Sequence, residues 1–108
     1  MRRGEIWTVA GGVYASKPRP AVIVQDDVFN LTSSVTVVPL TTSQVDASFL
    51  RLPIPADAES GLAHDSDAMI DKLTTVRRSN VGEKVGRLRD SDLRELERLL
   101  LAFLGISR

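Results

Sequence analysis

The sequence predicts an α+β fold made of several short β-strands followed by one C-terminal helix. Apolar and β-branched residues gather in short runs that Gly, Pro and polar residues separate, and near the C-terminus the apolar period becomes helical. A chain of 108 residues has the length of one domain, so we expect a single domain over 1–108. Strands followed by one helix are typical of a β-rich α+β domain.

Composition excludes several classes of protein. The 14 Lys and Arg balance 14 Asp and Glu, so any nucleic-acid site must be a local patch rather than a broadly basic surface. The absence of cysteine excludes disulfides and thiolate chemistry. No apolar run approaches the roughly 20 residues of a membrane span, and the N-terminus lacks a signal-peptide pattern. We therefore expect a cytoplasmic protein with no membrane partner.

Four strands are expected in the first half of the chain. Residues 5–10 are β-prone and stop at Gly11-Gly12, which tolerates turn geometry. Residues 21–24 and 35–40 are apolar on both faces, which is typical of buried strands. Residues 49–54 alternate, and their prolines suit an edge strand or a strand end.

The second half predicts a loop and two more strands. Residues 55–66 are polar and read as a surface loop. Residues 68–73 resume strand character and continue toward Val76, and 81–88 form a weaker last strand.

The C-terminal segment predicts an amphipathic helix. Asp92 with Glu95 resembles a capping box, and Asp90 and Asp92 suit a helix N-terminus through the helix dipole. Gly105 suits the position after the helix, with Ile106 folding back over the last turn. Large apolar side chains recur at helical spacing: Leu93, Leu96, Leu100, Phe103 and Leu104.

The sequence gives no metal or cofactor site. It contains no dinucleotide, P-loop, HExxH or GxSxG motif, and one histidine without cysteine argues against structural zinc. Asp65, Asp67 and Asp71 could hold a hard cation, but no calcium-loop pattern completes them, so an acidic, solvated loop is the favoured reading. His64, in a polar loop, reads as a surface histidine.

An arginine and a run of hydroxyls could together bind a phosphate. Arg19 lies between Pro18 and Pro20 on stiff backbone, and 41–43 (Thr-Thr-Ser) end a buried strand. A guanidinium and hydroxyl donors can hold a phosphate without a metal and stabilise charge that develops on it. The alternative pairs Arg19 with Glu5 and treats the hydroxyl run as a turn; from spacing alone it is the commoner case.

These residues also carry a family resemblance over essentially the whole chain. In order, the segments are 3–7 (RGEIW), 19–24 (RPAVIV), 38–42 (VPLTT), 69–73 (MIDKL), 85–88 (VGRL) and the final amphipathic helix. Together they resemble the MazF/PemK-type toxins of toxin–antitoxin modules. The resemblance implies an SH3-like β-barrel with a C-terminal helix, a homodimer with RNA along its groove, and an antitoxin whose flexible tail occupies the same groove.

The resemblance also implies an activity. Members of the family are metal-independent endoribonucleases that cut single-stranded RNA at short sequences. The RNA 2′-hydroxyl attacks the adjacent phosphate and leaves a 2′,3′-cyclic phosphate and a 5′-hydroxyl end. The family's catalytic arginine and threonine correspond to Arg19 and Thr41. Arg19 would stabilise the phosphorane, a role that ranks above acid catalysis because arginine hardly deprotonates, and Thr41 would hold a phosphate oxygen.

Five further residues are candidate RNA contacts. Thr42 adjoins Thr41, and Asp71 corresponds to an aspartate that acts as base or base-reader in some relatives. Phe49 falls near a family aromatic that contacts a base, and stacking suits single-stranded RNA. Lys17 and Arg77 are chosen for their charge alone, and each could equally be a solvated surface side chain.

Two departures leave the acid, the base and the recognition sequence unassigned. The loop at 11–18 is short and lacks the Gly-x-Glu-Gln stretch of many members, and Met69 stands where some relatives have an acid-acting arginine. Two other functions stay open. The first is a gyrase poison of the same fold, which would end in Trp-Gly-Ile, whereas residues 104–106 are Leu-Gly-Ile and the one tryptophan is Trp7. The second is a barrel that binds RNA or protein without chemistry.

Overall fold

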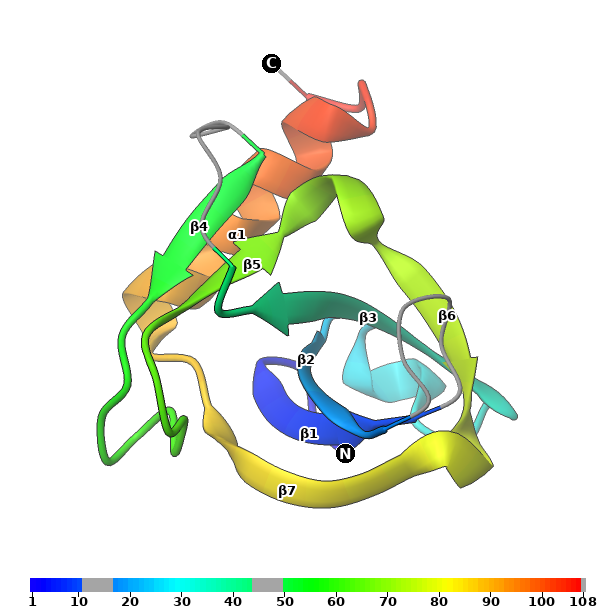
Figure 1. The fold of residues 1–108 in the computed structure, drawn as a ribbon. Helices are drawn as coiled ribbons and strands as arrows, with labels where there is room; N and C mark the ends of the chain where they lie inside the picture. Colours follow the sequence, from blue (N-terminus) through cyan, green and yellow to red (C-terminus); the bar gives the residue numbers. More distant parts are fainter. Residues whose placement is uncertain (11–16, 44–49, 108) are drawn as a thin grey trace.

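Seven strands form one antiparallel sheet that curls into a barrel-like shape, with a helix packed on its outside (Figure 1). The computed structural model describes residues 1–10, 17–43 and 50–107. The strands are β1 (Glu5–Val9), β2 (Arg19–Ile23), β3 (Ser34–Thr41), β4 (Arg51–Ile54), β5 (Ser66–Met69), β6 (Thr74–Arg77) and β7 (Val81–Arg87), and the helix is α1 (Asp90–Phe103). Three 3-10 turns, η1 (Asp27–Phe29), η2 (Ile70–Lys72) and η3 (Arg78–Asn80), connect them. The expected α+β class is confirmed.

Strand β3 organises the sheet because it pairs with three other strands. The order is β4-β5-β3-β2-β1-β7, and β6 also pairs with β3. The first half of β3 pairs with β6, from Ser34 opposite Arg77, whereas its end pairs with β5, with Thr41 opposite Asp67. The chain therefore crosses from one end of β3 to the other between β5 and β6.

This crossing corrects the single strand expected from residue 68 toward Val76. The segment is two strands joined by η2, because β5 and β6 pair with different halves of β3. Ile70, which continues the apolar run in the sequence, lies in the turn and is fully buried in the core. An apolar turn residue cannot be told from a strand residue by periodicity alone.

Two hydrophobic clusters cover the two faces of β2 and β3. The first lies between the sheet and α1 and includes Val22, Val38, Leu40 and Leu96; the second, on the other face, includes Ala21, Ile23, Val35 and Val37. Burial on both faces confirms what the continuous apolar runs predict.

The N-terminus of the helix differs from the predicted capping box, whereas its C-terminus agrees with the predicted glycine position. Arg89 is the N-cap and makes no side-chain cap hydrogen bond, so the expected capping box is wrong; the Asp92 carboxylate lies 3.5 Å from the Arg89 guanidinium instead. Gly105 has a φ of +72°. The Ile106 N–H donates to the Leu101 carbonyl over 2.9 Å, which closes a Schellman motif, although the Ile106 side chain is exposed rather than folded back. Within the described ranges, no helix is long and apolar enough to cross a membrane.

Candidate functional site

The register of the sheet brings three polar side chains into one row. Ala21 pairs with Pro39, and continuing that register by two residues sets Arg19 level with Thr41. Thr41 pairs with Asp67 on its other side. Side chains opposite each other on neighbouring strands share a face of the sheet. Arg19, Thr41 and Asp67 therefore form a row, named here the polar row, with Thr41 in the middle.

Arg19 begins β2 with an exposed side chain, and no other described residue forms an ion pair or hydrogen bond with it. Glu5, the alternative partner, binds other groups: its carboxylate accepts hydrogen bonds from the Trp7 indole at 2.9 Å and the Arg2 N–H at 2.8 Å, and lies 3.0 Å from Lys84 Nζ. Burial alone would raise the pKa of Glu5, but these donors outweigh it and lower the pKa to about 2. The structure therefore does not form the Arg19–Glu5 pair, and the guanidinium is left to bind an anion.

Thr41 ends β3 and is half-buried. The Ser43 N–H donates to Thr41 Oγ1 over 3.0 Å, so the hydroxyl oxygen is held by the turn that follows the strand. The hydroxyl proton remains a donor for a ligand. The turn and the phosphate-binding hydroxyl, considered as alternatives from the sequence, are thus compatible. Thr42 and Ser43 follow with exposed side chains.

Asp67 lies inside β5 and is only 7% exposed, so the reading of this aspartate as part of a solvated loop is wrong. Within the described residues, nothing donates a hydrogen bond to its carboxylate or forms an ion pair with it. Its neighbour Ala68 is fully buried in the core, so alternation along the strand turns Asp67 to the opposite face, toward the polar row. Strand alternation around Ala68 was the one sequence signal that could have separated Asp67 from its acidic neighbours.

Asp71 lies in η2, the turn that follows β5, where it forms an ion pair with Arg51 of β4. The side chain of Arg51 is 12% exposed, and its Nε is buried without a hydrogen-bond partner. Arg51 pairs across the strands with Met69. Position 69, where some relatives have an arginine, is a methionine here, but the Arg51 guanidinium reaches Asp71 from the neighbouring strand β4. The sequence did not point to Arg51.

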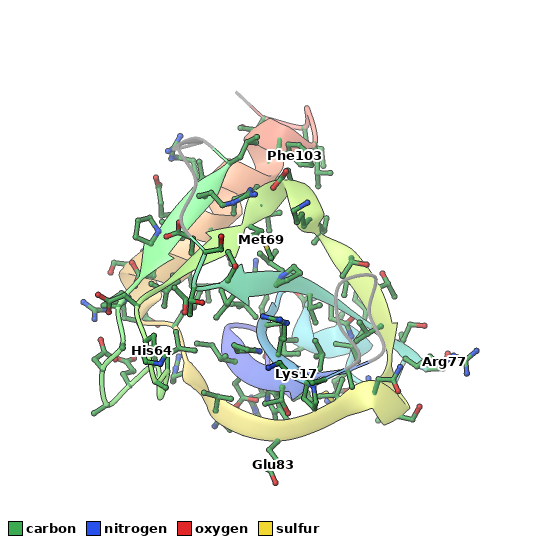
Figure 2. All side chains as sticks on the ribbon, viewed as in Figure 1. Lys17, His64, Met69, Arg77, Glu83 and Phe103 are labelled. Atoms are coloured by element: carbon green, nitrogen blue, oxygen red, sulfur yellow. The ribbon has the colours of Figure 1, made fainter. Side chains whose placement is uncertain are left out.

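The other candidate residues lie at varied distances from the polar row. Lys17 is exposed two residues before Arg19, and Figure 2 shows it over the middle of the barrel opening, with Arg77 at the edge. Arg77 pairs with Ser34, which lies at the opposite end of β3 from Thr41. At about 3.3 Å per residue, the strand from Ser34 to Thr41 is roughly 23 Å long. His64 is exposed in the loop before β5. Phe49 lies outside the described residues.

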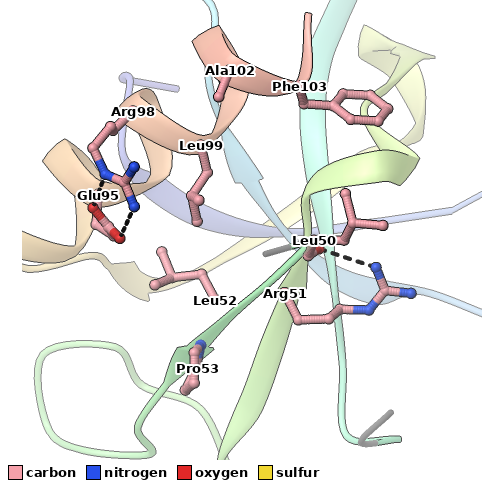
Figure 3. Close-up of a pocket in the computed structure, with 9 residues that line it drawn as sticks. All are labelled: Leu50, Arg51, Leu52, Pro53, Glu95, Arg98, Leu99, Ala102 and Phe103. Atoms are coloured by element: carbon pink, nitrogen blue, oxygen red, sulfur yellow. Dashed lines mark hydrogen bonds and ion pairs between the residues drawn. The ribbon is translucent and has the colours of Figure 1, made fainter. Parts of the chain in front are cut away.

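A separate groove of about 840 Å³ runs between β4 and α1 (Figure 3). Leu52 and Leu99 form part of its wall, and Phe103 lies at one end. The Arg98 guanidinium binds Glu95 through two hydrogen bonds of 2.7 Å on its rim. The neighbouring end of the chain exposes more apolar side chains: Leu101, Leu104 and Ile106. Large exposed apolar patches are typical of protein-contact surfaces.

Comparisons with known proteins identify the family of the chain. A family model described as the PemK-like, MazF-like toxin of type II toxin–antitoxin systems matches residues 2–104. The chain is 53% identical over 108 residues to the probable endoribonuclease MazF of Mycolicibacterium smegmatis, covering 99% of both chains. It is 30% identical over 116 residues to endoribonuclease MazF9 of Mycobacterium tuberculosis, covering 98% of both.

Solved structures show the same fold. Mycobacterium tuberculosis toxin MazF-mt6 superposes with a TM-score of 0.81 at 23% identity, covering 96% of this chain and 99% of the other. A mycobacterial endoribonuclease in complex with its cognate antitoxin gives a TM-score of 0.84 at 19% identity, covering 100% and 98%. Since the family model spans nearly the whole chain and a full-length relative is 53% identical, the chain belongs to the PemK-like, MazF-like toxins of type II toxin–antitoxin systems.

Proposed function

We propose that this endoribonuclease toxin cuts single-stranded RNA at specific short sequences without a metal. The RNA 2′-hydroxyl attacks the adjacent phosphorus, and the products are a 2′,3′-cyclic phosphate and a 5′-hydroxyl end. The observation that carries the proposal is the pairing of Ala21 with Pro39, because two residues further along the same strands come Arg19, whose side chain has no ion-pair partner among the described residues, and Thr41.

The two side chains have complementary roles. The Thr41 hydroxyl donates to a non-bridging phosphate oxygen, and the Arg19 guanidinium stabilises the negative charge that grows on the phosphorane. The hydroxyl oxygen of Thr41 is held before RNA binds, because it accepts a hydrogen bond from the Ser43 N–H, and Pro20 restricts the backbone from which the Arg19 side chain extends. Arginine keeps its proton at any working pH, so its contribution is charge stabilisation.

Further residues would bind the RNA on either side of the scissile phosphate. Lys17 and Thr42 adjoin Arg19 and Thr41 in the sequence, and Asp71 lies in the turn after β5. Phe49 stays a candidate for base stacking. Arg77 lies too far from Thr41 of the same chain to touch the same nucleotide, so it would contact RNA only at a distance. A local patch of this kind is compatible with zero net charge.

The test is cleavage of a long single-stranded RNA by the purified protein in excess EDTA. We expect discrete cuts whose fragments carry 5′-hydroxyl and 2′,3′-cyclic phosphate ends, with the same pattern and rate as without EDTA. Sequencing the fragments gives the recognition sequence. Intact RNA across varied sequences would refute the nuclease and favour a toxin that acts by binding. Cleavage only without EDTA would refute metal independence.

We also propose that the chain works in the cytoplasm as a homodimer and is neutralised by a cognate antitoxin. The apolar groove and the exposed end of α1 support a protein-contact surface. Solved relatives include a MazE-MazF complex from Deinococcus radiodurans, with a TM-score of 0.79 at 20% identity.

Sedimentation tests the dimer. We expect a mass of about twice 11.8 kDa, and a Phe103→Glu variant shifted toward the monomer, because a charge replaces an apolar side chain that is 46% exposed on this surface. Phe29→Glu is the comparison variant: Phe29 is 58% exposed in η1 and does not line the groove between β4 and α1, so this variant should leave the mass unchanged. A wild-type protein that sediments at 11.8 kDa and is fully active would rule out the dimer.

A further inference from the structure

We infer that Asp67 is the general base that removes the proton from the attacking 2′-hydroxyl. The inference rests on the proposed function, and it assigns the base that the sequence leaves unassigned. Its support is the position of Asp67 in the polar row, its burial and the absence of a protein partner within the described residues.

The position of Asp67 fits the geometry of an in-line displacement. Asp67 pairs directly with Thr41, and directly opposed residues have Cβ atoms about 4.5–5.5 Å apart; Arg19 lies on the other side of Thr41, two residues beyond the last β2–β3 pair. In phosphoryl transfer the attacking and leaving oxygens lie on opposite sides of the phosphorus. In the orientation that the inference assigns, a phosphate held by the Thr41 hydroxyl has its attacking side toward Asp67 and its leaving side toward Arg19.

The state of the carboxylate also fits a base. Asp67 is 7% exposed, and no described residue donates a hydrogen bond to its carboxylate, so the carboxylate oxygens remain available to accept a proton from a ligand. Asp71, another acid in this part of the chain, forms an ion pair with Arg51, whereas Asp67 forms none with the described residues. No ion pair joins Asp67 to either of two arginines in this part of the sheet. Arg51 lies on the same face of the sheet but forms its ion pair with Asp71, and Arg19 lies on β2, one strand beyond Thr41. Asp67 is thus the acid of the polar row that is left to take a proton.

The step balances as a transesterification. An Asp67 carboxylate oxygen accepts the 2′-hydroxyl proton as O2′ forms its bond to phosphorus. The bond between phosphorus and O5′ then breaks, and O5′ takes a proton from water. Asp67 returns its proton to solvent, so the enzyme ends the cycle unchanged and needs no oxidant, metal or second substrate.

The experiment compares Asp67→Asn with the wild type and with Glu83→Gln as control. Asparagine keeps the shape and the acceptor oxygen of aspartate but cannot take a proton. Glu83 is an exposed residue of β7 that points away from the barrel (Figure 2). Three quantities are measured: the single-turnover cleavage rate, the affinity for the same RNA with a 2′-deoxy residue at the cleaved position, and the melting temperature.

We expect Asp67→Asn to cut about 10²- to 10⁴-fold more slowly, the range that general base catalysis supplies. Its affinity for the 2′-deoxy RNA should stay within about threefold of wild type, and its melting temperature should not fall, because the Asp67 carboxylate makes no hydrogen bond or ion pair with the described residues that the substitution would break. Glu83→Gln should match wild type in all three.

Other outcomes overturn the inference and say why. A rate within about threefold of wild type means that another group is the base. A slower variant with a lower melting temperature means that Asp67 is structural. A loss of affinity for the 2′-deoxy RNA, or a changed recognition sequence, means that Asp67 reads a base. Failure of the wild type to leave cyclic phosphate ends would instead reject the proposed function itself, and with it the inference.

Discussion

An Arg19→Ala protein is expected to cleave RNA at least about a thousandfold more slowly than wild type, the loss typical of a guanidinium that stabilises a phosphoryl transition state. The fold should not change, because the Arg19 side chain is exposed and forms no hydrogen bond or ion pair with the described residues, and alanine keeps the backbone pairing with Val9. Single-turnover cleavage measures the rate, and affinity for a 2′-deoxy RNA should weaken by no more than about tenfold. A loss of rate that is much larger than the loss of affinity means that Arg19 stabilises the transition state more than it stabilises bound RNA.

Two variants sharpen this prediction. Arg94→Ala removes another exposed arginine, on α1, that has no ion pair with the described residues, and it should retain full activity. Arg19→Lys keeps the charge but loses the planar fork, so it should recover only a small part of the rate. If Arg19→Ala instead lost affinity and rate in equal measure, Arg19 would be a binding residue and the chain could be a binder without chemistry.

The regular elements could be predicted because their signals are local. Apolar runs of β2 and β3 reflect burial on both faces, and the leucine spacing of α1 reflects one buried face. Gly105 ends the helix as its conformational freedom predicts. The predicted capping box at the N-terminus of the helix is wrong, because Asp92 pairs with the Arg89 side chain and does not cap the backbone. A competing side-chain partner of this kind is not visible in a short motif.

The candidate site could be predicted only in part, because its assembly depends on register between distant strands. Arg19 and Thr41 were found from stiff backbone, hydroxyl clustering and family resemblance. Asp67 was missed because its meaning depends on lying opposite Thr41, a pairing across 26 residues of sequence. Arg51 was missed for the same reason, since it reaches Asp71 only because β4 lies next to β5. A single sequence does not fix such registers.

Replacing Leu96 with alanine is expected to lower the free energy of unfolding by about 2–5 kcal/mol, the usual cost of truncating a fully buried leucine. Leu96 is the buried residue of α1 and is 0% exposed, packed in the same cluster as Leu40, Ile54 and Leu88. For a chain of this length the melting temperature should fall by roughly 10–20 °C. Thermal and urea unfolding followed by circular dichroism measure both quantities.

Leu101→Ala is the matched control, because Leu101 lies on the same helix but is 41% exposed and should cost less than about 1 kcal/mol in the monomer. Well below its melting temperature, Leu96→Ala should cleave RNA at close to the wild-type rate per folded molecule, since the polar row lies on the opposite face of the sheet from the cluster that holds α1. It should lose activity on warming, as the folded fraction falls. Arg19→Ala should show the reverse, a stable protein without activity at any temperature. If Leu96→Ala were inactive while fully folded, α1 would act on the chemistry directly rather than by stabilising the sheet that carries it.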